Sequence, residues 1–157
     1  MRARAPRGGR RNRRPSSTQT SVQRRASINK NDKKLAKVTE VCLALPGAER
    51  RLSGSHATYL VRKKVFAYFL DDHHGDGIVS VCVKSELGEN VDRVRRDPER
   101  YYLPAYIGPR GWFGLRLDRG RVDWHEVASV VERSYRLTAP KTLAAKLDAA
   151  AKPRRGA

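Results

Sequence analysis

The apolar residues follow helical spacing in some segments and strand spacing in others, and their order predicts one folded domain. Apolar side chains recur at three- and four-residue intervals over residues 32–45, which predicts an amphipathic helix that ends at Pro46-Gly47. Two runs rich in aromatic and β-branched residues, 56–61 and 65–70, flank three bases and predict a hairpin with a basic tip. The nearly continuous apolar run 78–83 predicts a third strand with both faces covered.

The second half of the chain adds helices and one more strand. Ser85 is placed to cap a second helix, which Asp97-Pro98 ends, and residues 112–117 predict a strand between two turns. A capping box formed by Asp123 and Glu126 begins a third helix, and a last helix begins at Pro140. The predicted fold class is therefore α+β, a mainly antiparallel sheet with helices packed on it, in the order α-β-β-β-α-β-α-α.

Charge is distributed unevenly along the 157 residues. The chain contains 34 Lys and Arg against 16 Asp and Glu, a formal net charge of +18. Residues 1–30 hold ten of these bases and residues 152–157 hold three, both without an acid, so residues 31–151 carry 21 bases, all 16 acids and a net charge of +5. Because the two ends contain too few large apolar residues to form a core, they are predicted to be disordered basic tails around a single domain over residues 31–151. The alternative for the first tail is upstream sequence translated from a misplaced start codon.

Several functional classes find no support in the sequence. Cys42 and Cys82 lie in apolar patterns and are predicted to be buried thiols, which fits a cytoplasmic protein better than a disulfide-stabilised one. The chain has no apolar run long enough to cross a membrane, so no membrane partner is expected. We find no nucleophile beside a base, no Gly-rich phosphate loop and no paired carboxylates with a stated partner, so we expect neither an enzyme nor a cofactor.

One polar loop carries potential metal ligands. It contains Asp71, Asp72, His73, His74 and Asp76, a mixture of imidazoles and carboxylates that suits a divalent cation. A short flexible loop without a rigid frame is more often a solvated turn, and no metal site is predicted.

Basic side chains at the predicted turns are the candidate binding residues. Three adjacent bases project from the hairpin tip, and Gly108 and Gly111 clear the space around Arg110. Cationic groups on a rigid support suit a phosphate-rich partner. The alternatives are solvated turns and, for Arg110, stacking on a tryptophan. The candidates in the domain are Arg62, Lys63, Lys64, Lys84, Arg110, Arg116, Arg119 and Arg121, and those in the first tail are Arg10, Arg11, Arg13 and Arg14.

Six sequence segments together carry a family resemblance. In chain order they are Leu45-Pro46-Gly47-Ala48-Glu49, the 54–67 hairpin with Lys64-Val65-Phe66-Ala67, Asp97-Pro98-Glu99-Arg100, Gly108-Pro109-Arg110-Gly111-Trp112, Val122-Asp123-Trp124 and Ser134-Tyr135-Arg136-Leu137-Thr138-Ala139-Pro140-Lys141. Over roughly residues 39–147 the chain resembles the MmcQ/YjbR family of small bacterial proteins. The resemblance implies a shape related to the frataxin-like α+β sandwich and a double-wing mode of DNA binding through loops that project from the sheet. The chain departs from the family at Ser55-His56-Ala57, where Gly-His-Pro is usual.

These observations predict a non-enzymatic bacterial DNA-binding protein, cytoplasmic and associated with the nucleoid. Double-stranded DNA is the leading partner and RNA the second. Sequence specificity is predicted to be weak, because no helix begins with side chains suited to reading bases. Two other classes stay open. One is a module whose basic surface binds an acidic protein or ribosomal RNA, and the other is an enzyme or small-ligand binder with a pocket around His56, Tyr59 and Arg110.

Overall fold

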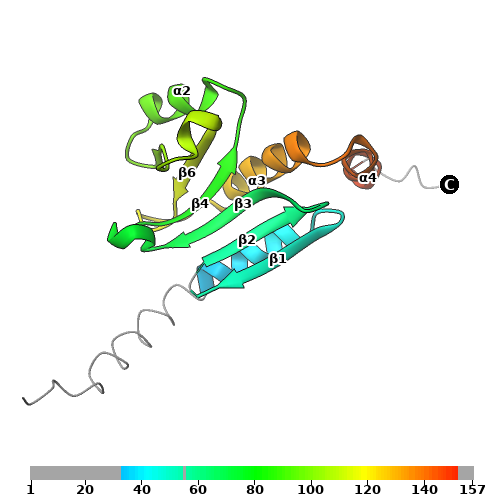
Figure 1. Ribbon diagram of the computed structural model, residues 1–157, viewed down its shortest axis with the longest axis horizontal. Coiled ribbons are helices and arrows are strands. Elements are labelled where there is room, and N and C mark those ends of the chain that lie inside the picture. The colour runs from blue at the N-terminus through cyan, green and yellow to red at the C-terminus, as the bar shows by residue number, and fades with distance from the viewer. Residues whose placement is uncertain (1–32, 55, 152–157) are drawn as a thin grey trace, which may run out of the picture.

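The computed structural model describes residues 33–54 and 56–151, which form one six-stranded antiparallel sheet with helices packed against it (Figure 1). The strand order across the sheet is β1-β2-β3-β4-β6-β5. The strands are β1 (Ala48–Ser53), β2 (His56–Val61), β3 (Lys64–Asp71), β4 (Val79–Lys84), β5 (Tyr101–Tyr102) and β6 (Trp112–Arg116). The helices are an N-terminal helix over residues 33–43, α2 (Glu89–Arg96), α3 (Trp124–Thr138) and α4 (Lys141–Ala151), with short 3₁₀ helices η1 (His73–Gly75) and η2 (Gly108–Arg110).

The structure confirms the predicted α+β class and adds two strands to the predicted order. Strand β1 forms one edge of the sheet beside β2, and the two-residue strand β5 forms the other edge beside β6. The two predicted basic tails lie outside the described residues. Among the described residues, no helix is both long enough and apolar enough to span a membrane.

The prediction that Ser85 caps the second helix is wrong. Helix α2 begins after Gly88, whose φ of 90° only glycine adopts without strain, and no side chain caps it. The Ser85 hydroxyl instead donates a hydrogen bond to the Gly111 carbonyl (2.9 Å). Ser85 therefore joins β4 to the segment that enters β6.

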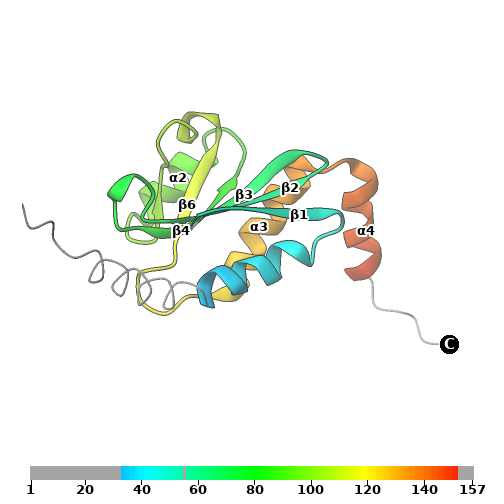
Figure 2. The ribbon, with the colours of Figure 1, turned by 60° about the horizontal axis from the view of Figure 1, so that its bottom comes forward.

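The hydrophobic core lies between one face of the sheet and the helices. Register places Ala67 opposite Val83, Phe69 opposite Val81, and Val83 opposite Phe113, and these alternate residues are all buried in the core. The N-terminal helix and α3 cover this face together, on one side of strands β1–β4 (Figure 2). Both cysteines are buried free thiols, as predicted.

Two buried side chains of helix α3 fasten it to the sheet and to the turn that precedes β1. The Ser134 hydroxyl donates to the Phe66 carbonyl (2.6 Å) and accepts the Lys84 amide proton (2.8 Å), so it joins β3 to β4 at one end of the sheet. The Tyr135 hydroxyl donates to the Pro46 carbonyl (2.6 Å). These bonds hold the β2–β3 turn region in a fixed position relative to α3.

Asp123 caps α3, as the sequence predicted. Its Oδ1 accepts hydrogen bonds from the backbone amides of His125 (3.0 Å) and Glu126 (3.3 Å), which have no partner within the helix. Glu126, expected to reach back to residue 123, forms an ion pair with Arg100 instead.

We expect Asp123→Ala to lower the free energy of unfolding by about 1 kcal/mol, because it removes the acceptor for two helix-terminal amides. Urea denaturation followed by circular dichroism measures this change. Asp123→Ser keeps a capping oxygen and should cost much less. Equal losses in the two variants would contradict a capping role for this side chain.

Candidate functional site

The sheet register separates the predicted basic residues into two groups at opposite ends of the strands. Val61 pairs with Lys64 around the β2–β3 turn, and Lys84 pairs with Trp112, which places Arg110 at the same end. We call Arg62, Lys63, Lys64, Lys84 and Arg110 the hairpin-end cluster. From β2 to β6 this end spans three strand spacings, about 14 Å.

The remaining predicted bases of the domain lie at the other end of β6. Ser80, near the start of β4, pairs with Arg116 at the end of β6, and Arg119 and Arg121 follow in the next turn. Because the two groups lie at opposite ends of the strands, the eight predicted bases do not form one contact surface for a ligand. The four predicted bases of the first tail lie outside the described residues.

The hairpin tip has a backbone conformation that its residues do not favour. Arg62 and Lys63 form the whole two-residue turn between β2 and β3, with φ of 50° and 65°. Two consecutive positive φ values are typical of a type I′ turn, in which Asn-Gly is preferred because other residues are strained in the left-handed region. The tip therefore carries two long cationic side chains at a cost in backbone energy.

The side chains of the hairpin-end cluster are available for an anionic partner. Arg62, Lys63, Lys64 and Arg110 are exposed, and Lys84 is half-buried. Among the described residues, the ion pairs of the domain involve other arginines, and none neutralises a member of the cluster.

A rigid loop presents Arg110. The buried Asn90 amide nitrogen donates to the carbonyls of Gly108 (2.7 Å) and Trp112 (3.0 Å), which holds both ends of η2. Gly111 has φ of 94°, and a Cβ there would lie 2.6 Å from the Ser85 carbonyl oxygen, so the chain requires glycine. The Trp112 ring packs on Tyr68 with centroids 5.3 Å apart, as expected for a packing residue.

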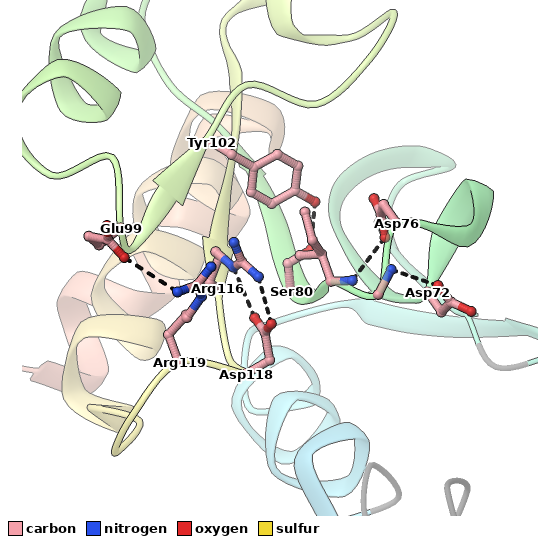
Figure 3. Close-up of polar contacts among 10 residues, drawn as sticks. Asp72, Asp76, Ser80, Glu99, Tyr102, Arg116, Asp118 and Arg119 are labelled. Carbon is pink, nitrogen blue, oxygen red and sulfur yellow. Dashed lines mark hydrogen bonds and ion pairs between the residues drawn. The ribbon is translucent and has the colours of Figure 1, made fainter.

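At the opposite end of the sheet, two of the three predicted bases, Arg116 and Arg119, form ion pairs with acidic neighbours (Figure 3). The Arg116 guanidinium makes a two-pronged contact with Asp118, at 3.1 and 2.7 Å, and Arg119 lies 3.4 Å from Glu99. Burial raises the pKa of the Asp118 carboxyl, but the hydrogen bonds from Arg116 and from the backbone, together with the charges of Arg116 and Arg119, lower that pKa below its usual value. These arginines are thus partly neutralised, whereas Arg121 is exposed.

The polar loop between β3 and β4 is organised by its own carboxylates. Asp72 Oδ1 accepts the Gly77 amide proton (2.7 Å), and Asp76 Oδ1 accepts that of Ile78 (2.9 Å), as Figure 3 shows. Across the part of the chain that the structure describes, no group of three or more His, Cys, Asp and Glu side chains is arranged to hold a metal ion. The loop carboxylates bind backbone amides and thereby fix the turn into β4.

Sequence reasoning did not assign three arginines that lie close to the hairpin-end cluster. Arg93, Arg133 and Arg136 line a cavity of about 190 Å³ between α2, α3 and the end of β4, where Lys84 also contributes. Glu89 pairs with Arg93 (3.4 Å) and Arg133 (2.7 Å), so this part is less cationic than the tip. The three-residue interval between Arg133 and Arg136 indicates a shared helix face, but only the packing of α3 shows that this face lies beside Lys84.

The pocket considered around His56, Tyr59 and Arg110 does not form. Tyr59 is fully buried on the helix-covered face, where its hydroxyl bonds to Thr39 (2.7 Å). Successive side chains of a strand point to opposite faces of the sheet. Because His56 and Tyr59 are three residues apart in β2, His56 lies on the face opposite to Tyr59. Arg110 is at the far end of the strands from His56.

Comparison with known proteins agrees with this architecture. A family model described as YjbR matches residues 43–137, which is more than half of the chain. The chain belongs to the YjbR family. No curated protein matches this YjbR-family chain. Its fold is similar to the crystal structure of Deinococcus radiodurans protein DR2400, a DUF419-domain protein, with a TM-score of 0.57 and 16% sequence identity over 78% of this chain and 94% of the other. At that identity the likeness establishes a shared fold.

Proposed function

We propose that this YjbR-family protein binds double-stranded DNA through the hairpin-end cluster and acts by binding rather than by catalysis. The observation that carries the proposal is the strained β2–β3 turn, in which Arg62 and Lys63 occupy positions that favour Asn-Gly. Strain of this kind is concentrated at functional sites. Two exposed cations at a projecting turn suit contact with phosphates.

Other features of the domain support the same partner. Lys64, Lys84 and Arg110 extend the cationic surface across the hairpin end of the sheet, about the width of a groove and its flanking phosphates. The first tail adds ten bases and no acid, so it is suited to neutralising neighbouring phosphates. Contacts to phosphate do not read base sequence, and we propose weak sequence specificity.

A salt titration of the full chain with duplex DNA tests this proposal. If about six phosphates are neutralised, a plot of log affinity against log salt should have a slope near −5, since each contact contributes roughly −0.9. Fluorescence anisotropy of a labelled duplex between about 50 and 300 mM NaCl measures the slope. An affinity that does not change with salt, or no binding at the lowest salt, would rule the proposal out. Tighter binding to an RNA duplex of the same length would reassign the partner.

A further inference from the structure

The sheet face away from the N-terminal helix and α3 contains a cavity that is separate from the hairpin-end cluster. The cavity, of about 410 Å³, lies between the strand surface and the segment that follows β5. Tyr68 of β3 and Tyr102 of β5 contribute aromatic side chains, and Tyr106 of the covering segment contributes a third. His56 and His73 also line it, with their rings edge to face and centroids 4.7 Å apart. A volume of this size suits a small organic ligand.

The side chains that line the cavity do not favour a phosphate group as the recognised feature. Lys and Arg are absent from the described residues that line it, and its one carboxylate belongs to Asp76. Ser53 and Thr58 add hydroxyls beside the aromatic rings. His56 Nε2 lies 3.2 Å from the Asp71 carbonyl oxygen, which can only accept, so Nε2 donates a hydrogen bond to it. This combination suits a flat, uncharged ring with polar edges.

Tyr106 is strained and exposed at the rim of the cavity. Its φ is +67°, a value that a bulky residue rarely adopts, and its side chain is 86% exposed. The Ile107 amide donates to the Ala105 carbonyl (2.8 Å) across Tyr106, which forms a tight three-residue turn. The flanking chain is firmly held, since the Gly108 amide donates to the Pro104 carbonyl (3.0 Å). The fold thus keeps an aromatic ring in an unfavourable backbone position that glycine would occupy without strain.

We propose that this cavity binds a planar heteroaromatic ring of the size and polarity of a nucleobase, and that Tyr106 stacks on the bound ring. Two sources supply that chemistry: a free nucleoside, and an unpaired base in a single strand of nucleic acid. Tyr106 serves to position the ring, while His56 and the hydroxyls on the strands bond to its edge. Because the described residues of the lining include neither Lys nor Arg, a 5′-phosphate adds no affinity at this site.

A titration monitored by ¹H–¹⁵N NMR of the full chain tests the proposal with adenosine, guanosine, their monophosphates and a short single-stranded oligonucleotide. Saturable shifts confined to residues around His56, Tyr68, Tyr102 and Tyr106 are expected, with equal affinity for nucleoside and monophosphate. Saturation by nucleosides identifies a free molecule as the source, and saturation by the oligonucleotide alone identifies an unpaired base. Absence of saturable shifts with all five probes, or a clear preference for the phosphorylated forms, overturns the proposal.

Tyr106→Gly provides the decisive variant. It should weaken binding roughly tenfold, a typical loss for one stacked ring, while raising the melting temperature because the backbone strain is relieved. Leu87→Ala, which truncates another exposed apolar side chain (78% exposed) outside this cavity, should leave both unchanged. Unchanged ring affinity in Tyr106→Gly would overturn the role of Tyr106. Duplex binding at the hairpin end should be the same in both variants, so this test is independent of the proposed function.

Discussion

Replacing Gly114 by alanine is expected to destabilise the domain by about 3 kcal/mol, because the added methyl group overpacks the sheet. A Cβ at this position in β6 would lie 2.2 Å from Tyr102 Cε1, 2.5 Å from Cζ and 2.8 Å from Cδ1. Real Cβ atoms do not approach other heavy atoms so closely, so either the Tyr102 ring or the strand must move. Both options disturb a well-packed region.

The Tyr102 ring cannot move without losing polar contacts. Its hydroxyl hydrogen-bonds to the buried Ser80 hydroxyl (2.7 Å; Figure 3). It also lies 3.5 Å from the Cys82 sulfur. Burial raises the pKa of the Tyr102 phenol above its ordinary value, so the group stays a neutral hydrogen-bonding partner at every physiological pH. Displacing the ring leaves Ser80 without this partner, which adds about 1 kcal/mol to the cost of overpacking.

Urea denaturation of Gly114→Ala measures the effect, and Gly108→Ala is the matched control. A Cβ at Gly108 would meet Leu103 at 3.5 Å, an ordinary contact distance, so that variant should lose much less stability. Combining Gly114→Ala with Tyr102→Ala should cost less than the sum of the two single changes, because the smaller residue leaves room for the new methyl group. A loss below about 1 kcal/mol for Gly114→Ala would show that the sheet and ring adjust freely.

Replacing the hairpin tip Arg62-Lys63 by Asn-Gly is expected to raise stability and weaken DNA binding at the same time. Asn-Gly suits the positive φ values of the turn, so the free energy of unfolding should rise by about 1 kcal/mol. Loss of two phosphate contacts should reduce the salt slope by about 1.8 and lower affinity roughly 10- to 60-fold at about 0.1 M salt. A change that weakens binding only by damaging the fold would lower stability, so it cannot produce higher stability together with weaker binding.

Two control variants identify the cause of the loss in affinity. The first tests whether charge or backbone conformation is responsible, and the second tests which end of the sheet contacts DNA. Arg62→Gln with Lys63→Gln keeps the strained turn but removes the charges, and it should lose affinity without gaining stability. Arg119→Gln with Arg121→Gln removes two charges from the opposite end of the sheet and should change the salt slope little. If the second pair weakens duplex binding and the tip variants do not, the DNA contact lies at the end of β6 instead. Thermal melts and anisotropy on the same samples distinguish these outcomes.

Short, exposed elements such as strand β1 were not predicted from the sequence, because they lack an apolar pattern. Strand β1 contains Glu49, Arg50 and Arg51, and nearly all of its residues are exposed. Charged side chains on an edge strand discourage pairing with other chains, but they also remove the alternation by which strands are recognised. The hairpin and the strand at residues 78–83 were predicted to within a residue or two because they bury their side chains in the core.

The hydroxyl of Ser85 illustrates how a local signal is overruled. Serine a few residues before an apolar helical pattern is a normal cap, yet here the hydroxyl bonds to the Gly111 carbonyl, 26 residues away. Asp123 was predicted correctly because both of its partners lie within three residues of it. Local hydrogen bonds follow from local sequence, whereas a partner brought in by the sheet does not.

The sequence by itself determined the α+β class, the order of the helices, the buried thiols and the basic turns, because periodicity, capping and turn chemistry act over a few residues. Tertiary structure alone decided which bases share a surface, since strand register placed Arg110 at the same end of the sheet as the hairpin tip and Arg116 at the far end. It also decided that His56 and Tyr106 line one cavity, although 50 residues separate them in the chain. Pairing across a sheet depends on long-range packing and turn geometry, which no short stretch of sequence encodes.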